Sequence, residues 1–83
     1  MTFDEAILLI KQELNRAEKI HPEWPDDKIH AAAIVSEESG ELVQACNNYK
    51  NRDPEQYETA LWLNVKTEAI HTAVTAIRFL INM

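Results

Sequence analysis

Residues 34–45 read IVSEESGELVQA, and the helical spacing of their apolar positions sets the expected fold class. At about 100° per residue, these positions form one stripe with apolar residues before and after the segment. The stripe consists of Ala31, Ile34, Val35, Leu42, Ala45 and Tyr49. The alternation of apolar and polar residues that is typical of a strand is absent from the chain. The segment therefore predicts a long helix with one apolar face.

Glycine and proline, which interrupt regular secondary structure, are scarce in the chain. There is one glycine, and the three prolines fall at two places, within 22–25 and at residue 54. Thr2 and Glu5 have the spacing of a capping box ahead of an apolar stripe. We therefore expect a first helix over residues 3–20, ended by the first two prolines.

Two further helices are expected after the proline joints. Asp26 or Asp27 can cap a second helix that runs to about Tyr49. Asp53 can cap a third helix with Pro54 at its first position, continuing to about residue 81. The sequence thus predicts a single all-α domain over residues 1–83, with three helices per chain.

The third helix is apolar around most of its circumference, which indicates neighbours on several sides. Two helices of the same chain would leave part of this surface uncovered, and a chain of 83 residues has a small core of its own. The single cysteine, Cys46, rules out an internal disulfide, and we expect it to be a small buried side chain. Self-association into a homodimer or homotetramer, which completes the helical bundle, is therefore expected.

The formal net charge is −6, from 14 acidic and 8 basic residues. Nucleic acid is not an expected partner, because phosphate binding depends on clustered Lys and Arg. No basic leader and no membrane-length apolar run is present, so we expect a cytoplasmic protein without membrane contact. The acidic excess also fits carboxylates that hold divalent cations.

Three glutamates lie within or beside the apolar stripe of the second helix. Glu38 falls in its middle, Glu41 about 60° to one side and Glu37 about 100° away, at the edge. An ionised carboxylate among apolar side chains is costly unless it is paired or binds a metal. Gly40, in mid-helix, costs roughly 1 kcal/mol relative to alanine and lets another helix or a ligand approach closely.

The third helix supplies Glu68 and His71, three residues apart and so on one face. If Glu38 and Glu41 face inward, a facing Glu68 completes a cage of carboxylate oxygens. Such a cage suits a hard cation, above all Mg²⁺, with Mn²⁺ as the next choice.

The order and spacing of these residues resemble the MazG-like all-α nucleoside triphosphate pyrophosphatases, a group that includes the dimeric dUTPases. Their pattern is Glu-Glu-x-x-Glu, a variable gap and then Glu-x-x-Asp. Here the first half is intact over 37–41, and the resemblance extends over about residues 24–80. It implies hydrolysis of a nucleoside triphosphate to the monophosphate and pyrophosphate. It also implies metal ligation by Glu38, Glu41 and Glu68, with Glu37 orienting the attacking water.

The chain departs from the family pattern at its last acidic position, which is His71. Neutral imidazole binds Mg²⁺ less well than a carboxylate does and shifts preference toward Mn²⁺ or later metals. We keep His71 as a fourth metal ligand and expect Asn48, Lys50 and Arg78 to contact the nucleotide.

Two other interpretations stay open. In one, the substitution at residue 71 impairs catalysis, and the chain is a helical oligomer that binds a nucleotide or metal in a regulatory role. In the other, the chain is a plain helical interaction module with solvated glutamates. The second predicts no response to divalent ions and no loss of stability in Glu38→Gln.

Overall fold

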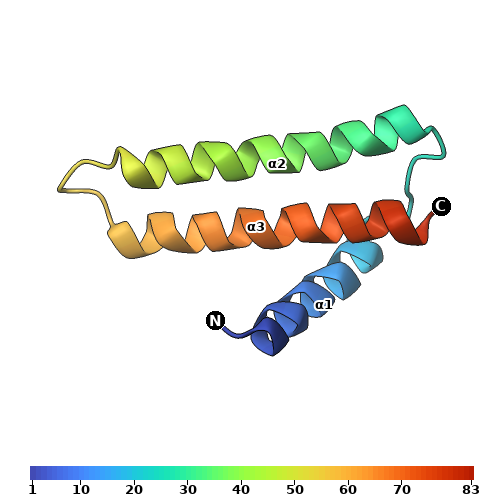
Figure 1. The fold of residues 1–83 in the computed structure, drawn as a ribbon, viewed down its shortest axis with the longest axis horizontal. Helices are drawn as coiled ribbons and strands as arrows, with labels where there is room; N and C mark the ends of the chain where they lie inside the picture. Colours follow the sequence, from blue (N-terminus) through green and yellow to red (C-terminus); the bar gives the residue numbers. More distant parts are fainter.

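The computed structural model describes residues 1–83 as three helices without a strand, which confirms the all-α class. The helices are α1 (Phe3–Ile20), α2 (Lys28–Lys50) and α3 (Glu58–Ile81). In Figure 1, α2 and α3 run antiparallel side by side, and α1 crosses α3 obliquely. Helix α3 packs on both of the others, whereas α1 and α2 do not pack directly against each other. No helix combines the length and the apolar composition needed to cross a bilayer.

The first two helices begin where the sequence predicts. The Thr2 hydroxyl accepts a hydrogen bond from the Glu5 N–H at 3.1 Å, and the Glu5 side chain accepts one from the Thr2 N–H. The Asp27 side chain accepts from the N–H of His30 at 2.9 Å. Both side chains satisfy backbone donors that a helix start leaves without a partner.

The predicted start of the third helix at Pro54 is wrong, because α3 begins at Glu58. Residues 53–56 form a turn in which the Gln56 N–H donates to the Asp53 carbonyl at 3.0 Å. The Gln56 side chain in turn accepts from the Asp53 N–H at 2.8 Å. These two hydrogen bonds fix the turn, and the N-cap residue Tyr57, which precedes α3, makes no side-chain capping hydrogen bond.

Little of the chain is fully buried. Ala31, Ala45, Val74 and Arg78 are buried, and no large side chain is completely enclosed. The expectation for Cys46 is wrong, since it is exposed. Its neighbour Ala45 takes the position on α2 that faces α3.

Arg78 holds the connection between α1 and α2. Its Nη2 donates to the carbonyl oxygens of His21 at 2.6 Å and Glu23 at 3.3 Å. The guanidinium carbon lies 5.0 Å from the centre of the Trp24 ring, a cation–π contact. One buried side chain of α3 thus fixes the proline-containing segment.

A shallow apolar hollow runs between α2 and α3, and we call it the α2–α3 groove. It is lined by Ala32, Val35, Ser36, Ser39, Ala76, Phe79 and Leu80. Large apolar side chains near it are exposed, with Leu80 65% and Val43 59% accessible.

Candidate metal centre

The three helices converge on His71, which α3 presents toward both of its neighbours. Its Nδ1 lies 3.7 Å from Oε2 of Glu68 and 3.8 Å from Oε2 of Glu38. Its Nε2 lies 3.5 Å from Oε1 of Glu13, on α1. One ligand atom from each of Glu38, Glu68 and His71 lies within 4.8 Å of the other two. The structure therefore brings together three of the residues that the sequence singled out.

The carboxyls of Glu38 and Glu68 lack the partners that buried charges need. The Oε2 atom of each is shielded from water and has no hydrogen-bond partner. The nearby Thr72 and Thr75 hydroxyls do not serve them, because they donate to helix carbonyls of α3. An ionised oxygen in this position is costly unless a cation compensates it.

The pKa values of Glu38 and Glu68 are both raised above the usual value for a glutamate. Burial raises the pKa of Glu38, and the charge of Glu41 raises it further. Burial also raises the pKa of Glu68, and the neighbouring Glu41 carboxylate, which favours the protonated form of Glu68, raises it further. The charge of His71 acts in the opposite direction on both. Glu41, also expected to be a metal ligand, is close enough to influence both carboxyls, but its side chain is exposed and its ligation of a metal stays a prediction.

Glu13 belongs to this site although the sequence analysis did not identify it. Its Oε1 faces His71, and its side chain is 19% exposed. Arg16 donates to Glu13 from Nε at 2.8 Å, and this hydrogen bond lowers the pKa of Glu13. The only signal in the sequence was its spacing of three from Ile10, which puts it beside the inner stripe of α1.

The donor set fits a divalent cation. Adjacent ligands at about 2.1 Å from an octahedral ion lie roughly 3.0 Å apart, and opposite ligands lie about 4.2 Å apart. The separations of 3.7 and 3.8 Å between His71 and its two carboxylate neighbours lie between these values, so small side-chain movements would complete either arrangement. Two carboxylates and an imidazole suit Mn²⁺ or a later metal at least as well as Mg²⁺.

The remaining predicted site residues lie outside the cluster. Glu37, Asn48 and Lys50 are exposed on α2. Lys50 lines a polar hollow at the α2–α3 turn together with Arg52. Substrate contacts by these residues stay a prediction.

Arg78, also expected at the nucleotide, lies ten residues beyond Glu68 on α3, about 15 Å along the helix. It is buried, and its Nη2 is engaged by the carbonyls of His21 and Glu23. In the structure Arg78 therefore holds the α1–α2 connection in place, and its contact with a substrate stays a prediction.

Compared with protein-family models, curated proteins and solved structures, the chain matches none of them.

Proposed function

We propose that this protein is a metal-dependent nucleoside triphosphate pyrophosphohydrolase that releases a nucleoside monophosphate and pyrophosphate. The supporting observation is the convergence of two water-shielded, unpaired carboxylate oxygens on His71 at 3.7 and 3.8 Å. That arrangement supports cation binding. The choice of nucleotide chemistry rests on the spacing of Glu37, Glu38, Glu41 and Glu68 and its resemblance to the MazG-like enzymes.

In this proposal Glu38, Glu41 and Glu68 hold the cation, with His71 as a fourth ligand. A bound divalent ion neutralises the triphosphate and activates a water molecule. Mg²⁺ is the physiological ion of choice, and the imidazole makes Mn²⁺ a good substitute. The Glu13 carboxylate faces Nε2 of the His71 imidazole. Such a carboxylate contact, made by the nitrogen that does not bind the metal, orients a ligating histidine.

Glu37 is the candidate for accepting a proton from the attacking water. Its side chain is exposed and lies on the same side of α2 as Glu41, which comes four residues later in the sequence. Glu38, half-buried on α2, is assigned both to the metal and to catalysis. Asn48 and Lys50, exposed toward the end of α2, supply contacts for the base or the phosphates.

A second candidate function is a nucleotide- or metal-binding helical oligomer without turnover. The observation in its favour is that His71 faces three carboxylates, so it can neutralise part of their charge by itself when protonated. In both candidates we propose a cytoplasmic homodimer or homotetramer.

The test is pyrophosphate release from a panel of standard and modified nucleoside triphosphates, each with Mg²⁺ or Mn²⁺. Glu38→Gln is expected to lose at least about 100-fold in turnover, since it removes a charged metal ligand. Glu18→Gln is the matched control, because Glu18 is an exposed glutamate on α1 outside the cluster.

Turnover that survives unchanged in Glu38→Gln would contradict the proposed site. No turnover with any nucleotide, combined with saturable metal or nucleotide binding, would favour the second candidate.

A further inference from the structure

We propose that Glu13 positions the metal ligand His71, and that a divalent cation bound at the cluster in turn tightens the docking of α1 on α3. The inference rests on the cation site of the proposed function and does not depend on hydrolysis. Its tests measure metal binding, the position of a ring proton and the exchange of backbone amides, so it can fail while the cation site stands.

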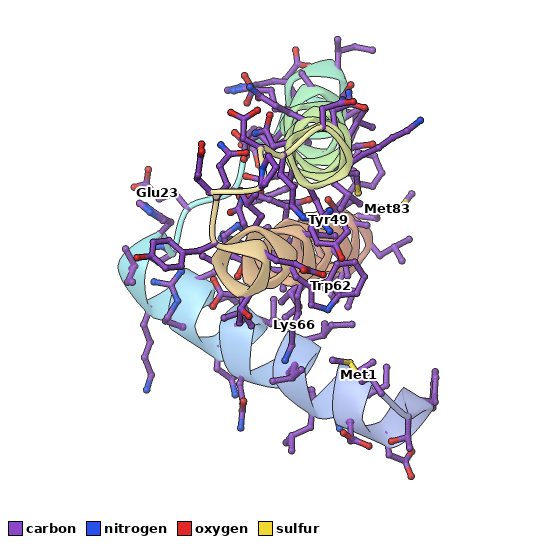
Figure 2. The ribbon with its side chains drawn as sticks, turned by 90° about the vertical axis from the view of Figure 1, so that its left-hand side faces the viewer. Met1, Glu23, Tyr49, Trp62, Lys66 and Met83 are labelled. Carbon is purple, nitrogen blue, oxygen red and sulfur yellow. The ribbon has the colours of Figure 1, made fainter.

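Helix α1 is the least firmly held of the three helices. It packs on α3 but not on α2, and none of its residues is buried, whereas α2 and α3 both contain buried residues. In Figure 2, where α2 and α3 are seen nearly end-on, α1 crosses below them and its two ends extend to the sides. A helix of 18 residues has little stability of its own in water, so the order of α1 depends on this short contact zone.

Two hollows show that the packing between α1 and α3 is incomplete. Both are lined by residues of the two helices, one around Glu13 and His71 and the other mainly by apolar side chains. A side chain that borders a hollow lacks partner atoms on that side and loses dispersion energy there. Apolar contacts therefore hold α1 weakly, and polar contacts contribute a larger share of its docking.

Polar contacts reach α1 at its C-terminal end and at its middle. Nη2 of Arg78 donates to the carbonyl of His21, directly after the helix. In the middle, Oε1 of Glu13 lies 3.5 Å from Nε2 of His71. Arg16 donates to both oxygens of Glu13, from Nε to Oε2 at 2.8 Å and from Nη2 to Oε1. The Glu13 carboxylate is thus held toward the imidazole by its own helix.

The two nitrogens of His71 face carboxylates on opposite sides of the ring. Nδ1 lies 3.7 Å from Oε2 of Glu68 and 3.8 Å from Oε2 of Glu38, so a cation held by these two carboxylates binds Nδ1. Only one nitrogen of a neutral imidazole carries a proton. A cation on Nδ1 therefore leaves the proton on Nε2, the nitrogen that faces Glu13.

Without the cation, nothing fixes the ring proton on the side of α1. The carboxylates of Glu38 and Glu68 attract it to Nδ1, and the lone pair of Nε2 then faces the Glu13 carboxylate. That arrangement is repulsive. A bound cation thus selects the form of the ring in which α3 attracts α1.

Coupling between two equilibria acts equally in both directions. If docked α1 strengthens cation binding by some factor, the cation strengthens the docking of α1 by the same factor. Carboxylate contacts of this kind contribute roughly 10- to 100-fold to metal affinity. Because the Glu13 side chain is 19% exposed and solvent screens its charge, we expect about tenfold in both quantities.

The first test is the affinity of Glu13→Gln for Mn²⁺, measured by electron paramagnetic resonance of the free ion. The variant keeps the size of the side chain and removes its charge, and it is expected to bind about tenfold more weakly. Glu18→Gln is the matched control, because it removes a charge from α1 outside the cluster and is expected to bind normally. Circular dichroism verifies that both variants fold. Equal affinity in the two variants overturns the inference.

The position of the ring proton is a direct readout of how Glu13 acts. Long-range ¹⁵N–¹H nuclear magnetic resonance of His71 is measured with saturating Mg²⁺, which is diamagnetic. The proton is expected on Nε2 in the metal-loaded chain. A proton on Nδ1 overturns the inference, because the cation then cannot bind the nitrogen that faces Glu38 and Glu68.

The deciding test is amide hydrogen exchange with and without saturating Mn²⁺. In the unmodified chain, exchange in α1 is expected to slow about tenfold, and this factor should agree with the loss of affinity in Glu13→Gln. In Glu13→Gln saturated with Mn²⁺, α1 is expected to lose most of this slowing, whereas exchange in α2 and α3 still slows. Equal slowing of α1 in both proteins overturns the inference.

The outcomes separate the inference from the proposed function. Mn²⁺ that protects α2 and α3 but leaves α1 of the unmodified chain unchanged overturns the coupling and leaves the cation site intact. The absence of saturable Mn²⁺ binding overturns both. Metal-dependent protection of α1 without hydrolysis of any nucleotide contradicts the proposed activity alone.

Discussion

At the scale of single residues, Glu38 and Glu68 are held in positions that apolar side chains normally occupy. Each has one carboxylate oxygen without water or a hydrogen-bond partner, and burial raises the pKa of both groups. A free carboxyl in such a place destabilises the fold once it ionises. A bound cation would remove that cost, so the stability of the fold is expected to depend on metal binding and on pH.

The pH dependence without metal follows from these pKa directions. A carboxyl whose pKa is higher in the folded state stabilises the fold below its unfolded pKa, about 4.3 for glutamate. That contribution is lost as pH rises through the folded pKa. Glu13, whose pKa is lowered by its hydrogen bond with Arg16, acts in the opposite direction and loses its contribution as pH falls.

We therefore expect Glu68→Gln to raise the melting temperature at pH 7 in the presence of a chelator. A gain of about 1 kcal/mol corresponds to roughly 4–8 °C in a domain of this size. At pH 4 the difference from the unmodified chain is expected to shrink, and Mn²⁺ should stabilise only the unmodified chain. Thermal unfolding followed by circular dichroism measures all three. A lower melting temperature for Glu68→Gln with chelator would contradict this account.

The residues of the cluster were predictable only in part. Glu38 was identifiable because it interrupts an apolar stripe on its own helix, and Glu68 and His71 because they lie three residues apart. Glu13 could not be identified from the sequence, because its contact with His71 depends on the angle at which α1 crosses α3. No local sequence pattern encodes that angle. The same holds for Arg78, whose carbonyl partners lie 57 and 55 residues away in the sequence.

At the scale of elements, the residues that flank each helix decide where it begins. The caps at Thr2 and Asp27 were predictable from local chemistry. The start of α3 was not, because the Asp53–Gln56 turn competes with a helix that begins at Pro54. The α1–α2 connection depends instead on a distant side chain, Arg78.

Arg78→Ala is expected to destabilise the chain by about 2–4 kcal/mol. It removes charge-assisted hydrogen bonds to two carbonyls and the contact with Trp24. Arg78→Lys should restore only part of this loss, since an ammonium lacks the planar fork. Chemical denaturation measures both, with Lys11→Ala as control, since Lys11 is exposed on α1. Unchanged stability in Arg78→Ala would contradict the structural role of this side chain.

Gly40→Ala is expected to stabilise the chain by about 1 kcal/mol, the helix-propensity difference. No other helix of the chain approaches Gly40, since only its chain neighbours and the backbone of its own helix lie within 4 Å of where the new methyl group would sit. The melting temperature should therefore rise by several degrees, with helical content unchanged. A fall would show that a ligand or a second chain approaches Gly40 closely.

At the scale of the whole molecule, the three helices form an elongated arrangement of 45 × 28 × 22 Å. It carries both an acidic cluster and the apolar α2–α3 groove. The sequence predicted uncovered apolar surface from the composition of the third helix. It could not show which face remains open, because that depends on where α1 and α2 pack.

Stability should therefore depend on protein concentration. If folding and association are linked, a 100-fold rise in concentration adds up to about 2.7 kcal/mol per mole of dimer. The melting temperature of the unmodified chain is expected to rise by several degrees over this range. A concentration-independent melting temperature for the unmodified chain would contradict linked association.

The central claim, that Glu38, Glu68 and His71 form a divalent-cation site, is tested most directly by counting bound Mn²⁺. Titration of the protein with Mn²⁺, followed by electron paramagnetic resonance of the free ion, gives the number of sites and their affinity. We predict a saturable site in each chain that Glu38→Gln or Glu68→Gln weakens at least about tenfold and Glu18→Gln leaves unchanged. The absence of saturable binding, or equal binding in all four proteins, would contradict the claim.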